Sequence, residues 1–347
     1  DGVVAINSTV LPKLLTITGP ILLEERGLTL TADNVLFELQ KAKEDTPDAP
    51  KSLIGELTPA LFETLANLEM QDLLLAADLL GSSLNEKDVQ LYFRNNALQS
   101  QMIQLGWAGV QKQVEGDYLM IVNSNIGGGK TDTIIDQNAH LDVAIQDNGQ
   151  IINTLTITKT HNGIASSELD GLNNVDYMRV YVPKGSTLLQ AEGFTPPPAS
   201  LFETSATPLK QDEDMLLAIS NESKDPGSKT DIWDESGKTV FGNWVQTGPG
   251  KSSTITLTYA LPFMIDELNE RDTAFEAAKA KLGFKNLTNY SLFVQKQSGA
   301  DKRSTTARIH LPESLKTVWS TADIESIEFS NLTDDSLNLL METLKYD

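Results

Sequence analysis

The glycines, lysine and threonine of IVNSNIGGGKTD, residues 121–132, are the residue types of a phosphate-binding loop. In such a loop the motif G-x-x-x-x-G-K-S/T joins a strand to a helix, and the helix N-terminus receives the phosphate. Counting back from Lys130 and Thr131, the first glycine position holds Ser124, and the following DTIIDQNAHLDVAI soon alternates like a strand. We therefore interpret this segment as a glycine-rich turn after an apolar strand, and not as a nucleotide site.

Other residue types that carry chemistry are sparse. The histidines, His140, His161 and His310, are far apart in the sequence and show no metal-ligand spacing. A G-x-S-x-G nucleophile elbow is absent, and the chain has no cysteine. We therefore predict no catalytic residue and no cofactor.

Carboxylates gather in DPGSKTDIWDESG, which we predict to be a loop. Asp225, Asp231, Asp234 and Glu235 lie close together there. Oxygen-rich loops bind Ca²⁺, although the spacing of an EF-hand is absent. A weak Ca²⁺ site and a simple solvated loop both remain open.

Aromatic residues offer one further kind of site. A sugar-stacking platform would draw on Trp107, Trp233, Trp244, Trp319, Tyr181 and Phe194. Aromatic side chains at strand positions also fill cores, and that is the simpler interpretation.

Residues 1–113 carry alternating strand and helix signals. Short apolar runs, GVVAI, ILLEERGLTLT and KDVQLYF, indicate strands. Between them STVLPKLLTITGP, TADNVLFELQKAKED, LIGELTPALFETLANLEM and QDLLLAADLLGSSL have helical spacing and capping residues. We predict an α/β domain here, with α+β as the alternative.

From Asp117 onward the apolar pattern changes to a period of two. Runs such as DYLMIVNSN, IINTLTITKTHN, DYMRVYVP and STITLTYALP are separated by turn-forming clusters, and Asn148-Gly149 is a hairpin signal. For residues 114–347 we predict an antiparallel β-sandwich of immunoglobulin-like or fibronectin-like outline. A helical insertion is expected near 263–283, and the C-terminal SLNLLMETLKYD is assigned to a strand. The predicted fold class is α+β with more than one domain.

The composition of the chain indicates which classes of partner it is expected to bind. A net charge of -21, spread over the whole chain, disfavours nucleic acid, because affinity for a polyanion requires clustered Lys and Arg. The absence of cysteine is compatible with an exported protein. The longest apolar segment, DLLLAADLL, is too short to span a bilayer, so contact with a membrane is expected only through a segment upstream of Asp1.

Several phrases together resemble the domain-of-unknown-function 4012 family of bacterial and archaeal envelope proteins. They are DGVVAINSTVLPKLLTITGPI, LTLTADNVLFEL, DVQLYFRNNALQSQMIQLGWAG, DYLMIVNSNIGGGKTD, DYMRVYVPKGSTLL and TVFGNWVQTGPGKSSTITLTYALP. The resemblance implies a membrane-anchored protein whose anchor, with the first part of the α/β domain, precedes Asp1. It brings no catalytic residues, because none are defined for the family.

The order of elements in the first domain is also distantly similar to the LytR-CpsA-Psr phosphotransferases. This similarity makes Arg26 and Asp33 candidates for a phosphate site, although the arginine-rich continuation of those enzymes is missing.

Two hypotheses follow. The first is an extracytoplasmic structural or adhesive protein of the cell envelope without catalysis of its own. Its partners would be other envelope proteins or surface polysaccharide, or further copies of the same chain. The alternative is a transferase or carrier for lipid-linked glycopolymers in envelope polysaccharide assembly.

Overall fold

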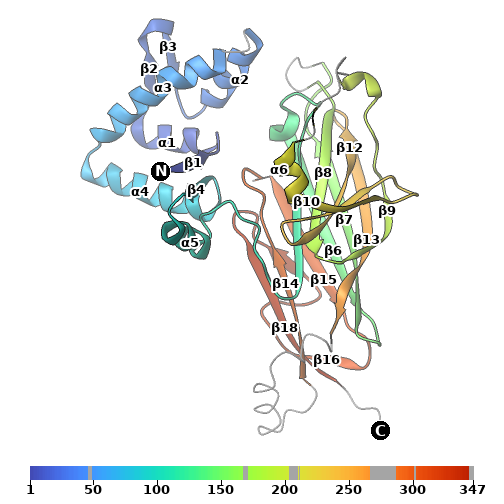
Figure 1. Ribbon diagram of the computed structural model, residues 1–347. Coiled ribbons are helices and arrows are strands. Elements are labelled where there is room, and N and C mark those ends of the chain that lie inside the picture. Colours follow the sequence, from blue (N-terminus) through green and yellow to red (C-terminus); the bar gives the residue numbers. More distant parts are fainter. Residues whose placement is uncertain are drawn as a thin grey trace. The chain divides into compact units, whose positions relative to one another are not determined.

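The computed structural model describes residues 1–45, 49–166, 171–202, 210, 212–265, 287–300 and 302–343. It divides the chain into two compact units, Asp1–Val110 and Gln111–Asp347 (Figure 1).

The first unit is mainly helical. Its helices are α1 (Val10–Thr18), α2 (Val35–Asp45), α3 (Ala49–Ala66), α4 (Met70–Asn85) and α5 (Asn96–Leu105). Strand β1 (Gly2–Ile6) pairs with β4 (Val89–Phe93), and β2 (Ile21–Leu23) pairs with β3 (Leu28–Leu30). Both pairs are antiparallel, so the described part of the unit is α+β, without the parallel strands of the α/β type that the sequence favours.

The core of this unit consists of aliphatic side chains that recur at helical spacing. Leu53, Leu57 and Leu61 lie on one face of α3, and they pack with Leu15 and Leu30. ILLEERGLTLT, expected as a single strand, forms a hairpin instead. The short 3-10 helix η1 (Glu24–Arg26) reverses the chain, and Gly27 follows it with φ 59°, a value that favours glycine.

The second unit contains two large sheets. The eight-stranded sheet has the order β10 (Ile219–Lys224), β11 (Asp231–Glu235), β12 (Lys238–Thr247), β8 (Asn174–Pro183), β5 (Asp117–Val122), β14 (Leu287–Val294), β18 (Asp335–Thr343) and β16 (Leu315–Ser320). The six-stranded sheet has the order β17 (Ile327–Phe329), β15 (Arg303–His310), β6 (Ile135–Ile145), β7 (Gln150–His161), β13 (Ser252–Met264) and β9 (Thr187–Glu192). The short helices are η2 (Thr131–Ile134), η3 (Ala199–Leu201) and α6 (Glu213–Ala218).

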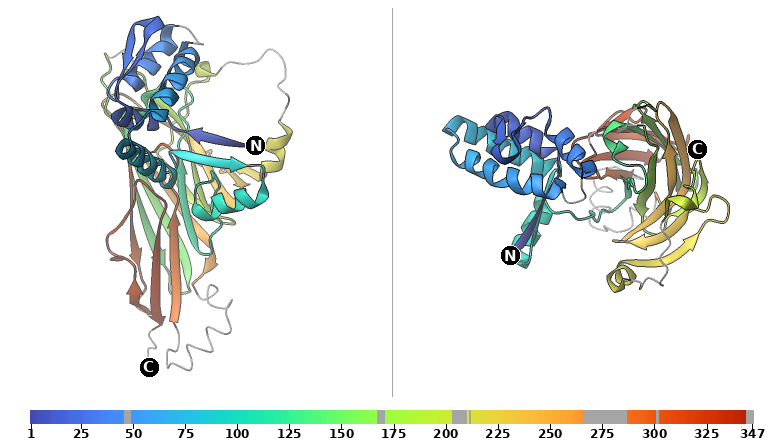
Figure 2. Two further views of the ribbon diagram at one scale, coloured as in Figure 1. Left: turned by 90° about the vertical axis from the view of Figure 1, so that its left-hand side faces the viewer. Right: turned by 90° about the horizontal axis from the view of Figure 1, so that it is seen from above.

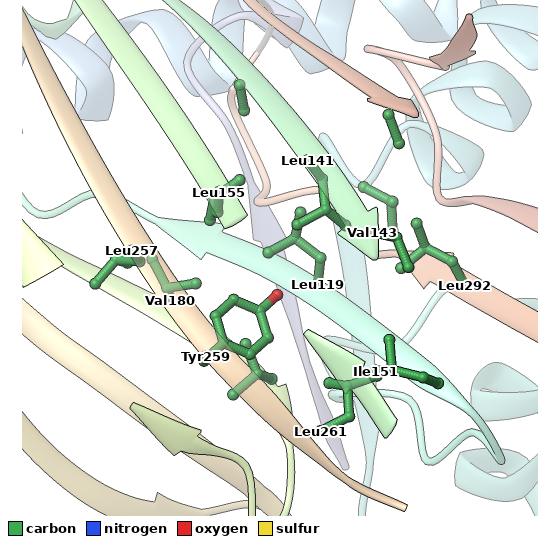
Figure 3. Close-up of a cluster of buried hydrophobic side chains, with 14 of the residues drawn as sticks. Leu119, Leu141, Val143, Ile151, Leu155, Val180, Leu257, Tyr259, Leu261 and Leu292 are labelled. Atoms are coloured by element: carbon green, nitrogen blue, oxygen red, sulfur yellow. The ribbon is translucent and has the colours of Figure 1, made fainter. Parts of the chain in front are cut away.

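The apolar core of the second unit lies between these sheets. On β6 and β7 every second side chain is buried, as the period of two requires. Leu141 and Leu155 from the six-stranded sheet pack in one cluster with Leu119, Val180 and Leu292 from the eight-stranded sheet (Figure 3). Seen from above, the strands of the second unit run around this core (Figure 2).

The direction of the strands differs from the prediction at two places. Strand β14 runs parallel to β5, and β15 runs parallel to β6. The sheets are therefore mixed, whereas we predicted an antiparallel sandwich. A period of two marks a strand and its buried face, but it does not encode the direction of the neighbouring strand.

Further differences concern helices. Helix α5, which we did not predict, begins where Asn95 Oδ1 accepts hydrogen bonds from the amides of Ala97 and Leu98. The expected helical insertion near 263–283 falls largely outside the described residues, and its first positions, Phe263 and Met264, belong to β13. The C-terminal segment forms β18, as predicted. Among the described residues, no helix combines the length and apolar character needed to cross a membrane.

Candidate functional site

The glycine loop is closed by its own hydrogen bonds and leaves no phosphate cradle. Asn125 Oδ1 accepts from the amide of Gly128, and Asn125 Nδ2 donates to the carbonyl of Gly129. Thr131 is buried and donates its hydroxyl proton to the Gly128 carbonyl. One 3-10 turn follows, and β6 begins directly after it, so no α-helix N-terminus faces the loop. The Gly128 amide and the Thr131 hydroxyl, donors that a phosphate would need, are thus already used within the loop.

A polar cluster lies buried beneath this loop. Lys159 on β7 donates to Asp176 Oδ2 at 2.6 Å and to Asn174 Oδ1 at 3.0 Å, both on β8. Because β7 and β8 belong to different sheets, these contacts cross the sandwich core. Burial lowers the pKa of Lys159 and raises the pKa of Asp176, while their mutual attraction opposes both changes.

A second buried carboxyl lies elsewhere in the core. Asp117 Oδ2 accepts hydrogen bonds from Tyr290 Oη at 2.6 Å and from Asn153 Nδ2 at 2.8 Å. Burial raises the pKa of Asp117 to about 6, although the hydrogen bonds to its oxygens favour the ionised form. A small cavity of about 40 Å³ in the second unit is lined by residues that include Gln137 and Arg303.

The larger cavity, about 620 Å³, lies on the outer face of the eight-stranded sheet and is called the outer pocket below. On β8, Tyr177, Arg179 and Tyr181 alternate with core residues and therefore point away from the core. The pocket is lined by Ser124, Ile126, Tyr177, Arg179, Met215, Ala218, Ile219, Glu222, Ser223, Asp231, Ile232, Trp233 and Glu235. Helix α6 and strand β10, which contribute to this lining, lie next to each other (Figure 1).

Arg179 is the cationic side chain of the outer pocket. Its Nη1 donates to Tyr181 Oη at 3.3 Å and its Nη2 to Ser124 Oγ at 3.4 Å, which are long hydrogen bonds. Within the described part of the chain, Arg179 forms no ion pair, and its buried Nε has no hydrogen-bond partner. A guanidinium with unused donors is suited to bind a carboxylate or another oxyanion.

The carboxylates of the outer pocket are oriented by aromatic donors. Tyr177 Oη donates to Asp231 Oδ2 at 2.8 Å, and Trp233 Nε1 donates to Glu235 Oε2 at 3.0 Å. Burial raises the pKa of Tyr181 to about 12; the charge of Arg179 opposes this rise and that of Glu235 adds to it, so the phenol stays protonated near neutral pH. The outer pocket therefore combines apolar surface, one cation and fixed hydrogen-bond acceptors, a combination typical of sites for small polar molecules.

The predicted Ca²⁺ ligands do not act together. Three of them, Asp231, Asp234 and Glu235, lie on strand β11 and not in a loop. Asp225 closes a turn by accepting from the amide and hydroxyl of Ser228, and Asp234 accepts from Thr239. Among the described residues, no group of three or more His, Asp or Glu side chains is arranged to hold a metal ion.

The two phosphate-site candidates of the first unit, Arg26 and Asp33, have different surroundings. Arg26 forms a bidentate ion pair with Glu56, at 2.6 Å and 2.8 Å, and also contacts Ser52. Asp33 is exposed. The guanidinium that a lipid-linked phosphate would need is thus occupied by a carboxylate of the same unit.

The structure brings together only some of the aromatic candidates. Trp233 and Tyr181 share a cluster on the outer face of the eight-stranded sheet, and Trp244 contacts Tyr177 edge to face. The others are elsewhere: Trp107 bonds to Asn85 in the first unit, Trp319 is exposed on β16, and Phe194 packs against the core.

Two histidines that appear separate in the sequence share one partner. His140 and His310 both approach Asp142, at 3.4 Å and 3.0 Å, because β6 and β15 are neighbours. His161 is buried, and its Nε2 lies 2.9 Å from the Leu172 carbonyl.

Sequence reasoning missed Arg179. A signal was present, because in DYMRVYVP the residues Tyr177, Arg179 and Tyr181 alternate with apolar ones and must share the face opposite to the core. The rest of the outer pocket comes from segments that only the strand order brings to this face.

Comparisons with known proteins add little. No family model and no curated protein matches the sequence. Among solved structures, a proposed nutrient-binding protein from Legionella pneumophila is 9% identical, over 66% of this chain and 71% of that chain, with a TM-score of 0.29. An M1 zinc metallopeptidase from Deinococcus radiodurans is 12% identical, over 62% of this chain and 43% of that chain, with a TM-score of 0.23. Similarity at this level carries no argument about fold or function.

Proposed function

We propose that this chain is an extracytoplasmic structural or adhesive protein of the cell envelope, without catalysis of its own, and that the outer pocket binds a surface polysaccharide. The proposal rests on Arg179, a guanidinium that forms no ion pair among the described residues of a chain with net charge -21. An arginine held this way beside two tyrosines and a tryptophan offers a place for an acidic sugar.

The chemistry of the outer pocket supports such a ligand. The two faces of a sugar ring differ, since one carries C–H groups and packs on aromatic surface. Tyr177 and the apolar side chains Ile126 and Met215 supply surface for that face. Asp231 and Glu235 would accept hydrogen bonds from hydroxyls, and Arg179 would bind a carboxylate of the sugar.

The architecture is compatible with this role. We propose an immunoglobulin-like or fibronectin-like outline for the sandwich, supported by two sheets that pack face to face around one core. The cysteine-free, acidic composition is compatible with an exported surface protein. Such a frame would hold the ligand on a sheet, which positions side chains more rigidly than a loop does.

Binding measurements with matched arginine variants test the proposal. Polysaccharide from the envelope of the producing organism is immobilised, and the Kd is measured for the wild-type chain, for Arg179→Met and for Arg308→Met. Arg308 is an exposed arginine on β15, so its replacement changes the net charge equally. We expect Arg179→Met to weaken binding about tenfold or more, because a charge-assisted hydrogen bond is lost.

Arg308→Met is expected to leave the Kd unchanged. Equal Kd values for all three proteins, or absence of binding by the wild-type chain, would contradict the proposal.

A further inference from the structure

Lys159, Asn174 and Asp176 form a buried triad between the two sheets. Their exposed fractions are 1%, 0% and 0%. Lys159 Nζ lies 3.0 Å from Asn174 Oδ1 and 2.6 Å from Asp176 Oδ2. Since Oδ1 is bonded to Cγ, the amine lies next to the carbonyl carbon of the asparagine.

We propose that Lys159 and Asn174 join in an intramolecular amide bond between Nζ and Cγ, with Asp176 as the acid–base group and ammonia as the leaving group. The inference is independent of the proposed ligand of the outer pocket.

The surroundings make Lys159 a nucleophile. A lysine attacks a carbonyl only as the neutral amine, and removal from water favours that form. Burial lowers the pKa of Lys159 and raises the pKa of Asp176, so proton transfer from the ammonium to the carboxylate becomes easier. The other charges that act on Lys159 are those of Asp132 and Arg303, which oppose each other.

The surroundings also fix the electrophile and its leaving group. Asn174 Nδ2 donates to Thr131 Oγ1 at 3.1 Å and to Asp132 Oδ1 at 2.9 Å, so the amide group cannot rotate freely. Asp132 is exposed, and departing ammonia would reach solvent along this side. The amide of Ser124 donates to Asp176 Oδ1 and holds the catalytic carboxylate in place.

The reaction balances without an oxidant or a cofactor. Asp176 takes one proton from the Lys159 ammonium, and the free lone pair forms the Nζ–Cγ bond, which leaves a negative charge on Oδ1. Protonated Asp176 hydrogen-bonds to this intermediate. When Oδ1 restores its double bond, the Cγ–Nδ2 bond breaks. Nδ2 leaves as ammonia with one of the two protons that Nζ has lost, and the other proton stays on Asp176, which ends as a neutral carboxylic acid.

The physical gain is the removal of buried charge. A buried ion pair is costly, because attraction between the partners only partly offsets the loss of hydration. After the reaction the lysine is a neutral amide, and the two sheets are joined covalently across the core.

Mass spectrometry of the wild-type chain is the first test and depends on no variant. We expect the intact mass to lie below the sequence mass by one ammonia molecule, about 17 Da. Trypsin should fail to cut after Lys159 and should release residues 131–179 as one peptide. A second cut after Glu168, between the two joined residues, should leave the pieces attached to each other.

Variants distinguish the bond from other losses of ammonia. Lys159→Met should restore the full sequence mass, whereas Lys251→Met, which replaces an exposed lysine, should still lack one ammonia. Asp176→Asn should not form the bond, so its measured mass should equal the mass calculated from its own sequence. A wild-type chain with the full sequence mass, or with separable peptides after the cut at Glu168, would overturn the proposal. So would an ammonia loss that survives in Lys159→Met, because it would indicate cyclisation of an asparagine instead.

Discussion

At the scale of single residues, Asp117 ties the stability of the second unit to pH. Its pKa is about 6 in the folded chain and 3.8 in the reference state without burial. Between these values the folded state keeps a proton that the unfolded state has lost. The stabilisation that this proton adds to the free energy of unfolding is therefore fully present below about pH 4 and is lost as the pH rises through 6.

We expect Asp117→Asn to remove this dependence. The amide oxygen of the variant still accepts from Tyr290 and Asn153, but it does not titrate. The wild-type chain should lose about 3 kcal/mol of unfolding free energy between pH 4 and pH 7 relative to the variant. Urea denaturation at several pH values measures this difference. A constant difference between the two proteins over that range would show that Asp117 does not titrate there.

The roles of single residues could be predicted from the sequence only in part. The sequence ruled out a phosphate loop, because Ser124 replaces a glycine and a strand pattern follows. It did not identify Lys159, Asn174 or Asp176, since each sits in an ordinary alternating strand, and burial of a charge depends on which strand lies opposite. The four acidic Ca²⁺ candidates looked alike in sequence, but hydrogen bonds within the fold give each a separate role.

At the scale of elements, the connection between β5 and β6 depends on the backbone at Gly128. A Cβ at this position would collide with the Asn173 carbonyl and the Val175 amide, whereas a Cβ at Gly127 would meet Val175 at ordinary contact distance. We expect Gly128→Ala to lower the unfolding free energy by about 1–3 kcal/mol, because the backbone must move.

Gly127→Ala is the matched control and should cost much less. Thermal unfolding of the two variants beside the wild-type chain compares them. Equal Tm values for Gly127→Ala and Gly128→Ala would contradict the tight packing of this loop against β8.

Elements themselves were the most predictable level. The period of two located β5 through β9 and β12 through β15, and helical spacing located α1 through α4. The parallel pairs β5–β14 and β6–β15 were not predictable, because the partners are more than a hundred residues apart and no local signal records their direction. Helix α5 was missed because its start signal is a single capping residue, Asn95.

At the scale of the whole molecule, the chain divides after Val110 into two compact units, which predicts that the second unit folds independently of the first. We propose that the second unit is a domain, since its core uses side chains from both of its own sheets. A chain of residues 111–347 should therefore unfold in one cooperative transition at a Tm close to one of those of the full chain. Calorimetry of both chains tests this, and a fragment without a transition would mean that the core needs residues 1–110.

Binding of an acidic sugar by the outer pocket is the central claim, and a crystal structure tests it most directly. The full chain is crystallised with an oligosaccharide released from the envelope polysaccharide of its producer. We predict density for a sugar in the outer pocket, with a carboxylate on the guanidinium of Arg179 and hydroxyls on Asp231 or Glu235. An empty outer pocket beside an oligosaccharide bound elsewhere on the chain would contradict the account.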